Sequence, residues 1–583
     1  MKFLLIGINS KFIHSNPAIH YLKAYVGEQY KEQIELAEYT INHLKEQILA
    51  DIYKRQPDVM GFSCYIWNFQ MIQELLPEIS KVLPGREIWL GGPEVSFEGE
   101  AVLRQFPGVT GIIQGEGEET FRELFLSYLQ HRDYRSIRGL LLREGATGMR
   151  EELAMDELPF LYQDLKEYEN RIIYYETSRG CPYHCTYCLS SVERKVRLRG
   201  RDKVEQELAY FLRQKVPQVK FVDRTFNCNK EHALFVWNYI KEHDNGVTNF
   251  HFEVAADIMD ERQLAVLSDM RPGLVQLEIG IQTTNEKTLR EIDRYADTGH
   301  IAQVVERLQR TGNIHIHLDL IAGLPYEDYT SFVHSFNQVY AMKPEQLQLG
   351  FLKVLKGAPM YRLTQKYGIA YQETPPYEVL YTNWLSYEEV LKLKRVEEMV
   401  EIYYNSCQFA KTLLVLKESF ESPFRMFEEL AKEYEARGYF VNTPSRSYRY
   451  RILLDFAASR EPEKEELFRE LLTCDYYLRE NAKSRPDFCM DLLPFYREIS
   501  DFYEKEEKCP QYLKDYQGYH AKQMMKMTHM ERFHYPVWEE DAAKIMRRRK
   551  GSYVLYDYQK RNPLTMDAKM TLILGENNEE ATS

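Results

Sequence analysis

Residues 178–191 read SRGCPYHCTYCLSS and carry three cysteines, Cys181, Cys185 and Cys188, in the spacing C-x3-C-x2-C. They follow RIIYYET, residues 171–177, which predicts a β-strand. Three thiolates at this spacing can enclose one metal centre. A structural zinc site normally takes four protein ligands, and His184 is poorly placed as the fourth because it lies between two cysteines. Three thiolates also suit an iron–sulfur cluster with one iron left open to a non-protein ligand, with zinc or unligated thiols as the alternatives.

The surrounding sequence predicts a barrel. Six strand-like runs alternate with helical patterns such as residues 204–214 and 231–242, and six βα units are too few for a complete eight-fold barrel. We therefore expect a partial, open (βα)6 barrel over residues 171–370, with the cysteines at the carboxyl end of its first strand. The six runs are RIIYYET (171–177), QVKFVD (218–223), NFHFEVA (249–255), LVQLEIGIQ (274–282), IHIHLDLIAG (314–323) and EQLQLGFLKV (345–354).

The flanking regions differ in pattern. Five strand–helix units over residues 1–135 predict a doubly wound, Rossmann or flavodoxin-like α/β domain, whose ligands bind beyond the carboxyl ends of the strands. Residues 136–170 read as a linker containing a small hairpin at 139–154. Amphipathic stretches such as 387–403 and 424–438 predict a mainly helical domain over residues 371–583, which ends in the acidic tail GENNEEATS.

Composition limits the class of protein. The net charge is −13 and neither half is strongly basic, so nucleic acid is not an expected partner. No run reaches the roughly 18 apolar residues of a membrane span, and MKFLLIGINS lacks a signal-peptide core, so a cytoplasmic location is expected. Nine cysteines, an odd and sparse number, do not suit a secreted disulfide framework.

The cysteine motif, with the aromatic Tyr187 before its third cysteine, resembles that of the radical S-adenosylmethionine (SAM) enzymes. This resemblance implies that Cys181, Cys185 and Cys188 hold a [4Fe–4S] cluster, that SAM chelates the open iron, and that its cleavage yields a 5′-deoxyadenosyl radical. VDRTFN, residues 222–227, falls where the family's loop meets the SAM amino group. Residues 277–294 and DLIAGLP, 319–325, resemble the branch containing oxygen-independent coproporphyrinogen oxidase. By position in these motifs, the residues implied to hold SAM are Glu253, Gln282, Arg294 and Asp319, with barrel-rim salt bridges as the alternative.

The first domain resembles the cobalamin-binding domain of B12-dependent radical SAM proteins. The resemblance rests on PDVMGFSCYIWN (57–68), GGPEVS (91–96) and GIIQGEGEETF (111–121). It implies that Ser63 and the amides around Gly91 and Gly92 contact the corrinoid; ordinary tight βα turns are the alternative. The D-x-H-x-x-G motif is absent, and His14 and His20 do not fit it, so we expect no histidine ligand below the cobalt.

The last third resembles the C-terminal region of a bacterial subgroup of these proteins, through TCDYYLRE (473–480), KSRPDFC (483–489) and VLYDYQKRNPLT (554–565). No chemistry comes with this resemblance. Cys474, Cys489 and Cys509 could hold an auxiliary cluster, but without a C-x2-C pair they are better interpreted as buried or incidental thiols.

Together these resemblances imply methylation of an unactivated carbon of a small-molecule or peptide substrate, with flavodoxin or ferredoxin as electron donor. A cobalamin-dependent cyclisation or rearrangement, and a non-catalytic corrinoid- or cluster-binding module, remain alternatives. A methylthiotransferase is disfavoured because the N-terminal region has only Cys64 where three cluster cysteines would be needed.

Overall fold

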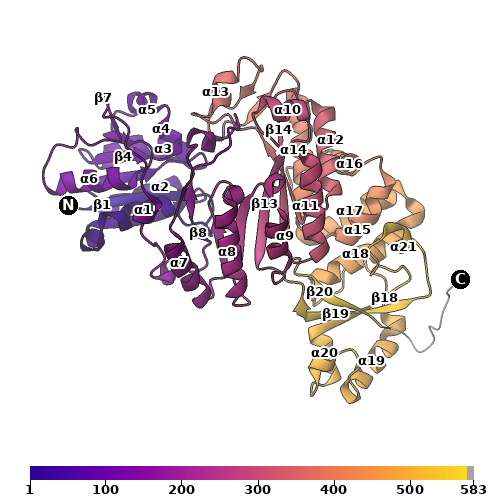
Figure 1. Cartoon of the computed structure of the whole chain (residues 1–583). Coiled ribbons are helices and arrows are strands. Elements are labelled where there is room, and N and C mark those ends of the chain that lie inside the picture. Colours follow the sequence, from indigo (N-terminus) through magenta and orange to yellow (C-terminus); the bar gives the residue numbers. More distant parts are fainter. Residues whose placement is uncertain (574–583) are drawn as a thin grey trace. The chain divides into compact units, whose positions relative to one another are not determined.

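The computed structural model describes residues 1–573 in two compact units (Figure 1). The first unit comprises Met1–Ile314, Ile321–Asp328 and Gly350–Tyr387. The second comprises His315–Leu320, Tyr329–Leu349 and the described residues from Glu388 onward. The acidic tail GENNEEATS lies outside the described residues.

The chain begins with a seven-stranded sheet in the order β2-β1-β3-β4-β5-β6-β7. Its first five strands are parallel, and the predicted hairpin around residues 139–154 adds β6 and β7 as an antiparallel edge. The strands are β1 (Phe3–Asn9), β2 (Ile34–Thr40), β3 (Val59–Ser63), β4 (Glu87–Gly91), β5 (Gly111–Ile113), β6 (Leu140–Leu142) and β7 (Gly145–Ala146). The helices are α1 (Pro17–Val26), α2 (Lys45–Arg55), α3 (Phe69–Val82), α4 (Pro93–Ser96), α5 (Gly99–Gln105) and α6 (Glu118–Leu129).

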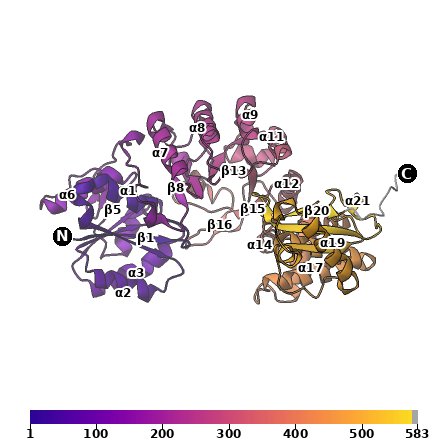
Figure 2. The same cartoon turned by 90° about the horizontal axis from the view of Figure 1, so that it is seen from below.

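This sheet is covered on both faces. In Figure 2, α2 and α3 lie on one side of the strands, and α1 and α6 lie on the other. Each side has its own apolar core, one including Ile48 and Ile72 and the other including Phe121 and Phe125. The doubly wound prediction is confirmed, in the flavodoxin-like order. Because β1 pairs with both β2 and β3, the strand order reverses at β1 and β3, where such folds bind ligands.

The second sheet has six strands in the order β15-β14-β13-β12-β11-β8, which confirms the partial barrel. The strands are β8 (Ile173–Tyr175), β11 (Gln218–Phe221), β12 (Asn249–Val254), β13 (Val275–Gln282), β14 (His315–Ala322) and β15 (Gln346–Phe351). The helices are α7 (Arg201–Arg213), α8 (Lys230–Glu242), α9 (Glu261–Ser268), α10 (Glu286–Glu291), α11 (Thr298–Thr311), α12 (Tyr329–Ala341) and α13 (Pro359–Leu363). Figure 2 shows α7, α8, α9 and α11 in sequence along the sheet.

Alternation along the strands separates two faces of this sheet. On β13, Leu277 and Ile279 are buried, whereas Glu278 and Gln282 at the alternate positions are partly exposed. Successive strand residues point to opposite faces, so one face is apolar and the other carries the polar groups. The predicted SAM residues Glu253 and Gln282 therefore occupy polar positions at or near the carboxyl ends of β12 and β13.

The C-terminal region is mainly helical, as predicted, but it also contains an unpredicted three-stranded antiparallel sheet, β18-β19-β20. Its helices are α14 (Tyr387–Met399), continued by a π-helical segment Val400–Asn405, then α15 (Ala410–Leu416), α16 (Pro423–Ala436), α17 (Arg446–Arg460), α18 (Glu465–Arg479), α19 (Tyr496–Lys508), α20 (Ala521–Met527) and α21 (Ala542–Ile545). Its strands are β18 (Thr528–Phe533), β19 (Ser552–Arg561) and β20 (Ala568–Ile573). The aromatic and β-branched residues of SYVLYDYQKR suit a strand. Within residues 1–573, each helix is either too short or too polar to span a bilayer.

Candidate functional site

A short antiparallel ribbon closes the cysteine loop. Its strands β9 (Ser178–Arg179) and β10 (Arg197–Leu198) pair with each other on either side of the loop. At the start of the loop, Gly180 has φ 92°, and a Cβ there would lie 2.2 Å from the carbonyl oxygen of Lys195. Glycine is therefore required, since any side chain would clash with the returning strand. The Cys181 amide then donates to the Glu193 carbonyl at 2.9 Å.

The three thiols of the motif are free, with Cys181 and Cys185 buried and Cys188 partly exposed. Burial raises the pKa of Cys185, while Arg294 lowers it and the charges of Cys188 and Cys181 raise it again. The three thiols therefore act electrostatically on one another. Three unpaired thiols on one short loop fit the predicted role as ligands of a shared metal centre.

One of the four predicted SAM residues, Arg294, lies beside these thiols, and a second, Gln282, lies near Arg294. Arg294 Nη1 is 3.7 Å from Cys185 Sγ and 3.4 Å from the Tyr187 hydroxyl. Its Nη2 donates to the carbonyl oxygen of Gly280, next to Gln282, and a Cβ on Gly280 would be 2.1 Å from Gln282 Nε2. Burial alone would lower the pKa of Arg294, but Tyr187 and Cys185 raise it well above its ordinary value, so the guanidinium stays charged.

This neighbourhood contains polar atoms that the protein does not satisfy. Among the described residues, Gln282 Oε1 and Arg294 Nε are buried without a hydrogen-bond partner. Gln282 also has φ 70°, a left-handed backbone that costs a non-glycine residue about 1–3 kcal/mol and tends to occur at functional sites. Buried polar groups are normally bonded, so an unsatisfied acceptor and donor beside three thiols fit a polar ligand such as SAM.

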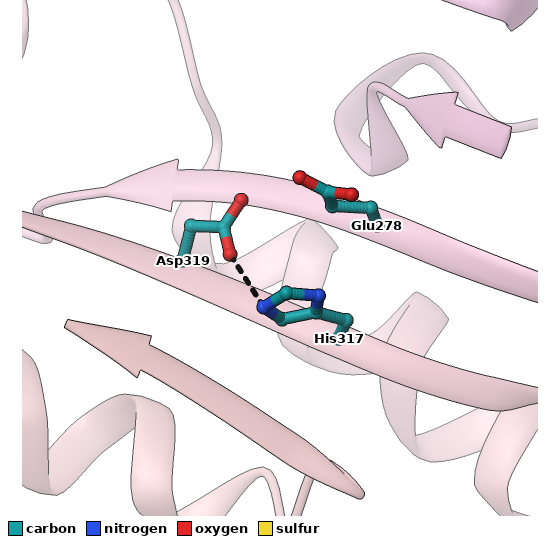
Figure 3. Close-up of side chains that lie close together, drawn as sticks. All are labelled: Glu278, His317 and Asp319. Carbon is teal, nitrogen blue, oxygen red and sulfur yellow. Dashed lines mark ion pairs between the residues drawn. The ribbon is translucent and has the colours of Figure 1, made fainter. Parts of the chain in front are cut away.

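The other two predicted SAM residues have different surroundings. Glu253 lies on β12 in register with Glu278 of β13. Asp319 lies on β14, where its Oδ1 forms an ion pair with His317 Nε2 at 3.0 Å (Figure 3). Glu278, labelled in the same view, accepts from His251 at 3.0 Å and from Lys220 at 3.3 Å. The polar face of the barrel sheet is thus charged as well as polar.

The loop VDRTFN, residues 222–227, forms hydrogen bonds with residues at the start of the cysteine loop. Asp223 is fully buried and accepts from the Thr177 amide at 3.0 Å, the Thr177 hydroxyl at 2.7 Å and the Ser178 hydroxyl at 2.5 Å. Thr225 contributes a hydroxyl 3.7 Å from Cys181 Sγ. Asp223 therefore fixes the residues that lead into the cluster motif.

Of the predicted corrinoid residues, Ser63 ends β3 at the switch point of the first sheet, whereas Gly91 and Gly92 lie at the end of β4. Contacts within the domain already involve Ser63 and Gly92. The Ser63 hydroxyl accepts from Asn16 Nδ2 at 2.8 Å and donates to the Ile6 carbonyl at 3.4 Å. Gly92 has φ 109°, and a Cβ there would be 2.5 Å from the Cys64 carbonyl, whereas Gly91 has ordinary space. The close approach to Cys64 explains why position 92 is a glycine, which agrees with the alternative of an ordinary tight βα turn.

The two histidines of the first loop are already bonded. His20 places one ring nitrogen 2.9 Å from Glu38 and the other 2.9 Å from the Tyr168 hydroxyl. His14 Nδ1 lies 2.5 Å from the Tyr174 hydroxyl of β8, and burial lowers its pKa. Both ring nitrogens of His20 and Nδ1 of His14 thus have partners within the protein. That no histidine ligates cobalt from below stays a prediction.

The sequence analysis missed the charged residues that join the first domain to the barrel. Arg179, at the stem of the cysteine loop, donates to Glu116 at 3.1 Å and to Glu118 at 2.7 Å. On the other side of the barrel rim, Glu98 accepts from Tyr361 at 2.6 Å and pairs with Lys356 at 3.1 Å. The only sequence feature that pointed to these ion pairs was the high density of acidic residues in GEGEE, residues 115–119, together with the arginines of SRGC and RLRGR. The loops assigned to the corrinoid thus also bind the barrel.

The three C-terminal cysteines have separate environments. Cys474 is buried within α18, Cys489 is partly buried, and Cys509 is exposed after α19. Burial raises the pKa of Cys474 and of Cys489 to about 12 each. Both thiols are therefore neutral at neutral pH, and the interpretation of these cysteines as packing residues stays a prediction.

Three family models match the chain in succession. Residues 4–125 match the B12 binding domain, residues 175–339 match the radical SAM superfamily, and residues 365–556 match a protein of unknown function, DUF4080. The boundaries agree with the first sheet, the barrel and the region that follows.

Known proteins share this arrangement. The chain is 24% identical over 432 residues to 2-(S-pantetheinyl)-carbapenam-3-carboxylate methyltransferase of Streptantibioticus cattleyicolor, covering 65% of this chain and 61% of that protein. The structure of the radical SAM methyltransferase TsrM from Kitasatospora setae, with cobalamin and a [4Fe–4S] cluster bound, aligns with TM-score 0.53 and 17% identity over 65% of this chain and 79% of that one.

A second solved structure covers more of the chain. The cobalamin-dependent SAM radical enzyme OxsB, with aqua-cobalamin bound, aligns with TM-score 0.56 and 14% identity over 87% of this chain and 76% of that one. The chain spans only 61%, 48% and 51% of the length of three curated relatives that it matches. The chain thus combines a B12-binding domain, a radical SAM domain and a DUF4080 region, in that order.

Proposed function

We propose that this protein is a cobalamin-dependent radical SAM methyltransferase acting on an unactivated carbon of a small molecule or peptide. The observation that carries the proposal is the cluster of Cys185, Arg294 and Gln282, where free thiols adjoin a charged guanidinium and two buried, unsatisfied polar atoms. A cluster-bound SAM would satisfy those atoms, and the chain's own side chains do not.

Each group of residues has its own task in this proposal. Cys181, Cys185 and Cys188 would hold the [4Fe–4S] cluster, Arg294 would bind the carboxylate of SAM, and Gln282 would accept a hydrogen bond from one of the SAM donors. Glu253 and Asp319 accept from the remaining SAM donors. The loops around Ser63, Gly91 and Gly92 carry the corrinoid at the carboxyl edge of the first sheet.

When bound, the cluster and SAM supply a hydrogen-abstracting radical, and cobalamin supplies a methyl carrier. The protein's residues bind, orient and shield these groups. A flavodoxin- or ferredoxin-type protein is the proposed electron donor. The proposed domains are residues 1–135 for cobalamin, 136–170 as linker, 171–370 for the radical SAM core and 371–583 for the C-terminal domain.

Two relatives support methylation, since both are methyltransferases by name. The experiment is anaerobic purification, iron and sulfide analysis, and absorption spectroscopy for cluster and corrinoid bands. With SAM and dithionite, the wild type should release 5′-deoxyadenosine, and Cys185→Ala should lose both iron and this product. Cys407→Ala is the matched control, a partly buried thiol far from the motif in the chain that should keep both.

The outcome of the reaction needs its own readout. A methyltransferase forms S-adenosylhomocysteine in step with 5′-deoxyadenosine once substrate is present, whereas a cyclisation or rearrangement forms no S-adenosylhomocysteine. A reconstituted wild type with full iron content that releases no 5′-deoxyadenosine would favour the non-catalytic module instead. A protein that takes up iron but no corrinoid would refute the cobalamin part alone.

A further inference from the structure

The stem of the cysteine loop carries two like charges face to face. In the β9–β10 ribbon, Arg179 stands directly opposite Arg197. Like charges at opposed positions of an antiparallel pair repel each other, and these side chains are only 14% and 10% exposed, so water screens them little. The ribbon therefore needs counter-charges to close the loop.

The first domain supplies those counter-charges. Glu116 Oε1 accepts from Arg179 at 3.1 Å and from Arg197 at 2.6 Å, and its Oε2 accepts from Arg197 at 3.1 Å. The Leu153 amide donates to Oε2 at 2.8 Å. Glu118 Oε1 accepts a hydrogen bond from Arg179 Nη2 at 2.7 Å. Both oxygens of Glu116 are thus engaged by the protein, which leaves it unsuited to bind a ligand.

The barrel's own acids are weaker partners. Glu176 accepts from Arg179 Nε at 3.1 Å, and Glu193 pairs with Arg197. Burial raises the pKa of Glu176 to about 7 and also raises the pKa of Glu193. At Glu116, burial would raise the pKa, but the hydrogen bond from Arg197 and the charge of Arg179 outweigh it, so this carboxylate stays ionised. Glu116 is therefore the counter-ion that stays charged beside both Arg179 and Arg197.

Few residues separate Glu116 from the cysteine thiols, so a movement of Glu116 would also move the cysteine loop. Arg179 is separated from Cys181 only by Gly180, whose backbone is pressed against Lys195. Across the loop, the Glu193 carbonyl accepts from the Cys181 amide at 2.9 Å, while the Glu193 side chain pairs with Arg197. Glu116 itself lies in the loop between β5 and α6, at the carboxyl edge of the first sheet.

We propose that Glu116, assisted by Glu118, is a positioning residue that couples the cobalamin-binding edge of the first domain to the geometry of the cysteine loop. Occupation of either cofactor site then changes the affinity of the other by the same factor, as linkage requires. This inference rests on the proposed function, because it takes the corrinoid and the cluster as the two ligands.

The first test uses the cofactor-free full-length protein. Glu116→Gln keeps the size of the side chain and removes its charge, and Glu100→Gln is the matched control, since Glu100 is 75% exposed in a pair with Arg104. Hydrogen exchange should accelerate across residues 177–199 in Glu116→Gln but not in Glu100→Gln. Unchanged exchange in that segment would overturn the proposal. If Glu116→Gln does not fold, Glu118→Gln, which loosens only Arg179, takes its place with the same expectation.

The second test measures the coupling itself. Hydroxocobalamin is titrated into wild type with and without its reconstituted cluster, under anaerobic conditions, and the two dissociation constants are compared. We expect them to differ by about fivefold or more in the wild type and in Glu100→Gln, and to become nearly equal in Glu116→Gln. Equal constants in a wild type that binds both cofactors would refute the coupling and leave the proposed function intact. A wild type that binds neither cofactor would refute the proposed function, and the coupling with it.

Discussion

Two buried carboxylate sites, one in each compact unit, bind different kinds of donor. In the second unit, Asp475 accepts from the Lys411 amide at 2.8 Å, the Thr412 amide at 2.9 Å and the Thr412 hydroxyl at 2.7 Å, at the start of α15. In the same unit, Glu506 accepts from the Leu513 amide at 2.8 Å. In the first unit, Glu116 and Glu118 bind arginine side chains that come from another domain.

The difference separates a structural use of buried charge from a positioning use. A carboxylate that accepts backbone amides fixes a turn or caps a helix and has little left to offer a ligand. A carboxylate that accepts from a distant guanidinium fixes one domain against another. In the first unit, buried polar atoms of Gln282 and Arg294 lack hydrogen-bond partners, and Arg294 lies beside the free thiol of Cys185. The chemistry is therefore expected beside the cysteine motif.

The largest effect should follow from Arg179→Met. This change leaves Glu116, Glu118 and Glu176 without a shared cation in a largely buried site, and breaking a buried pair typically costs about 3–5 kcal/mol. Urea denaturation should show the loss in the first unit, accompanied by lower iron retention. A destabilisation below 1 kcal/mol would mean that the junction is not held by these charges and would remove the contrast between the units.

Asp475→Ala should have a smaller effect, confined to the second unit. It strands two backbone amides and one hydroxyl, and buried donors without partners cost about 1–3 kcal/mol in total when part of the loss is relieved by water. Hydrogen exchange should rise in residues 410–416, while iron and cobalamin content stay at wild-type levels. A loss of either cofactor would contradict the structural role assigned to this residue.

The pH dependence of the free energy of unfolding should test both buried carboxylate sites, because burial raises the pKa of both Glu176 and Asp475 to about 7. A carboxyl with a raised pKa in the folded state stabilises the fold fully below its unfolded pKa and loses this contribution as pH rises through about 7. Between pH 5.5 and 8, each group should lower the free energy of unfolding by about 1–2 kcal/mol. Glu176→Gln and Asp475→Asn should each flatten this slope, measured by urea denaturation at each pH. A slope that neither variant changes would assign the titration to other groups.

The smallest effect should come from an exposed pair. Arg290 and Glu286 lie four residues apart on α10, and Arg290 Nη2 is 2.8 Å from Glu286 Oε2. Their side chains are 77% and 82% exposed. Such a pair contributes about 0.3–0.5 kcal/mol, so Arg290→Met should leave the urea midpoint nearly unchanged and lose even that effect in high salt. A cost comparable with that of Arg179→Met would show that burial is not what distinguishes the junction.

Much of the fold could be predicted because its signals are local. Strand runs such as KFLLIGI and NFHFEVA are short and apolar, and the helices between them follow a 3.6-residue period, so both sheets appeared at the expected positions. The strands of the C-terminal sheet were missed because Tyr-rich segments such as SYVLYDYQKR lack a clear alternation of buried and exposed residues. Register and strand order depend on partners far away in the chain.

The sequence by itself determined the fold class, the spacing of Cys181, Cys185 and Cys188, and the residue types available for SAM, because these depend on neighbours in the chain. Only the tertiary structure decided which charges meet. Arg179 and Glu116 are separated by 63 residues, and no local pattern selects one acid among the many in this chain as the partner of a given arginine. That choice is made when two domains bury the pair together, since an ion removed from water must find its counter-ion in the same place.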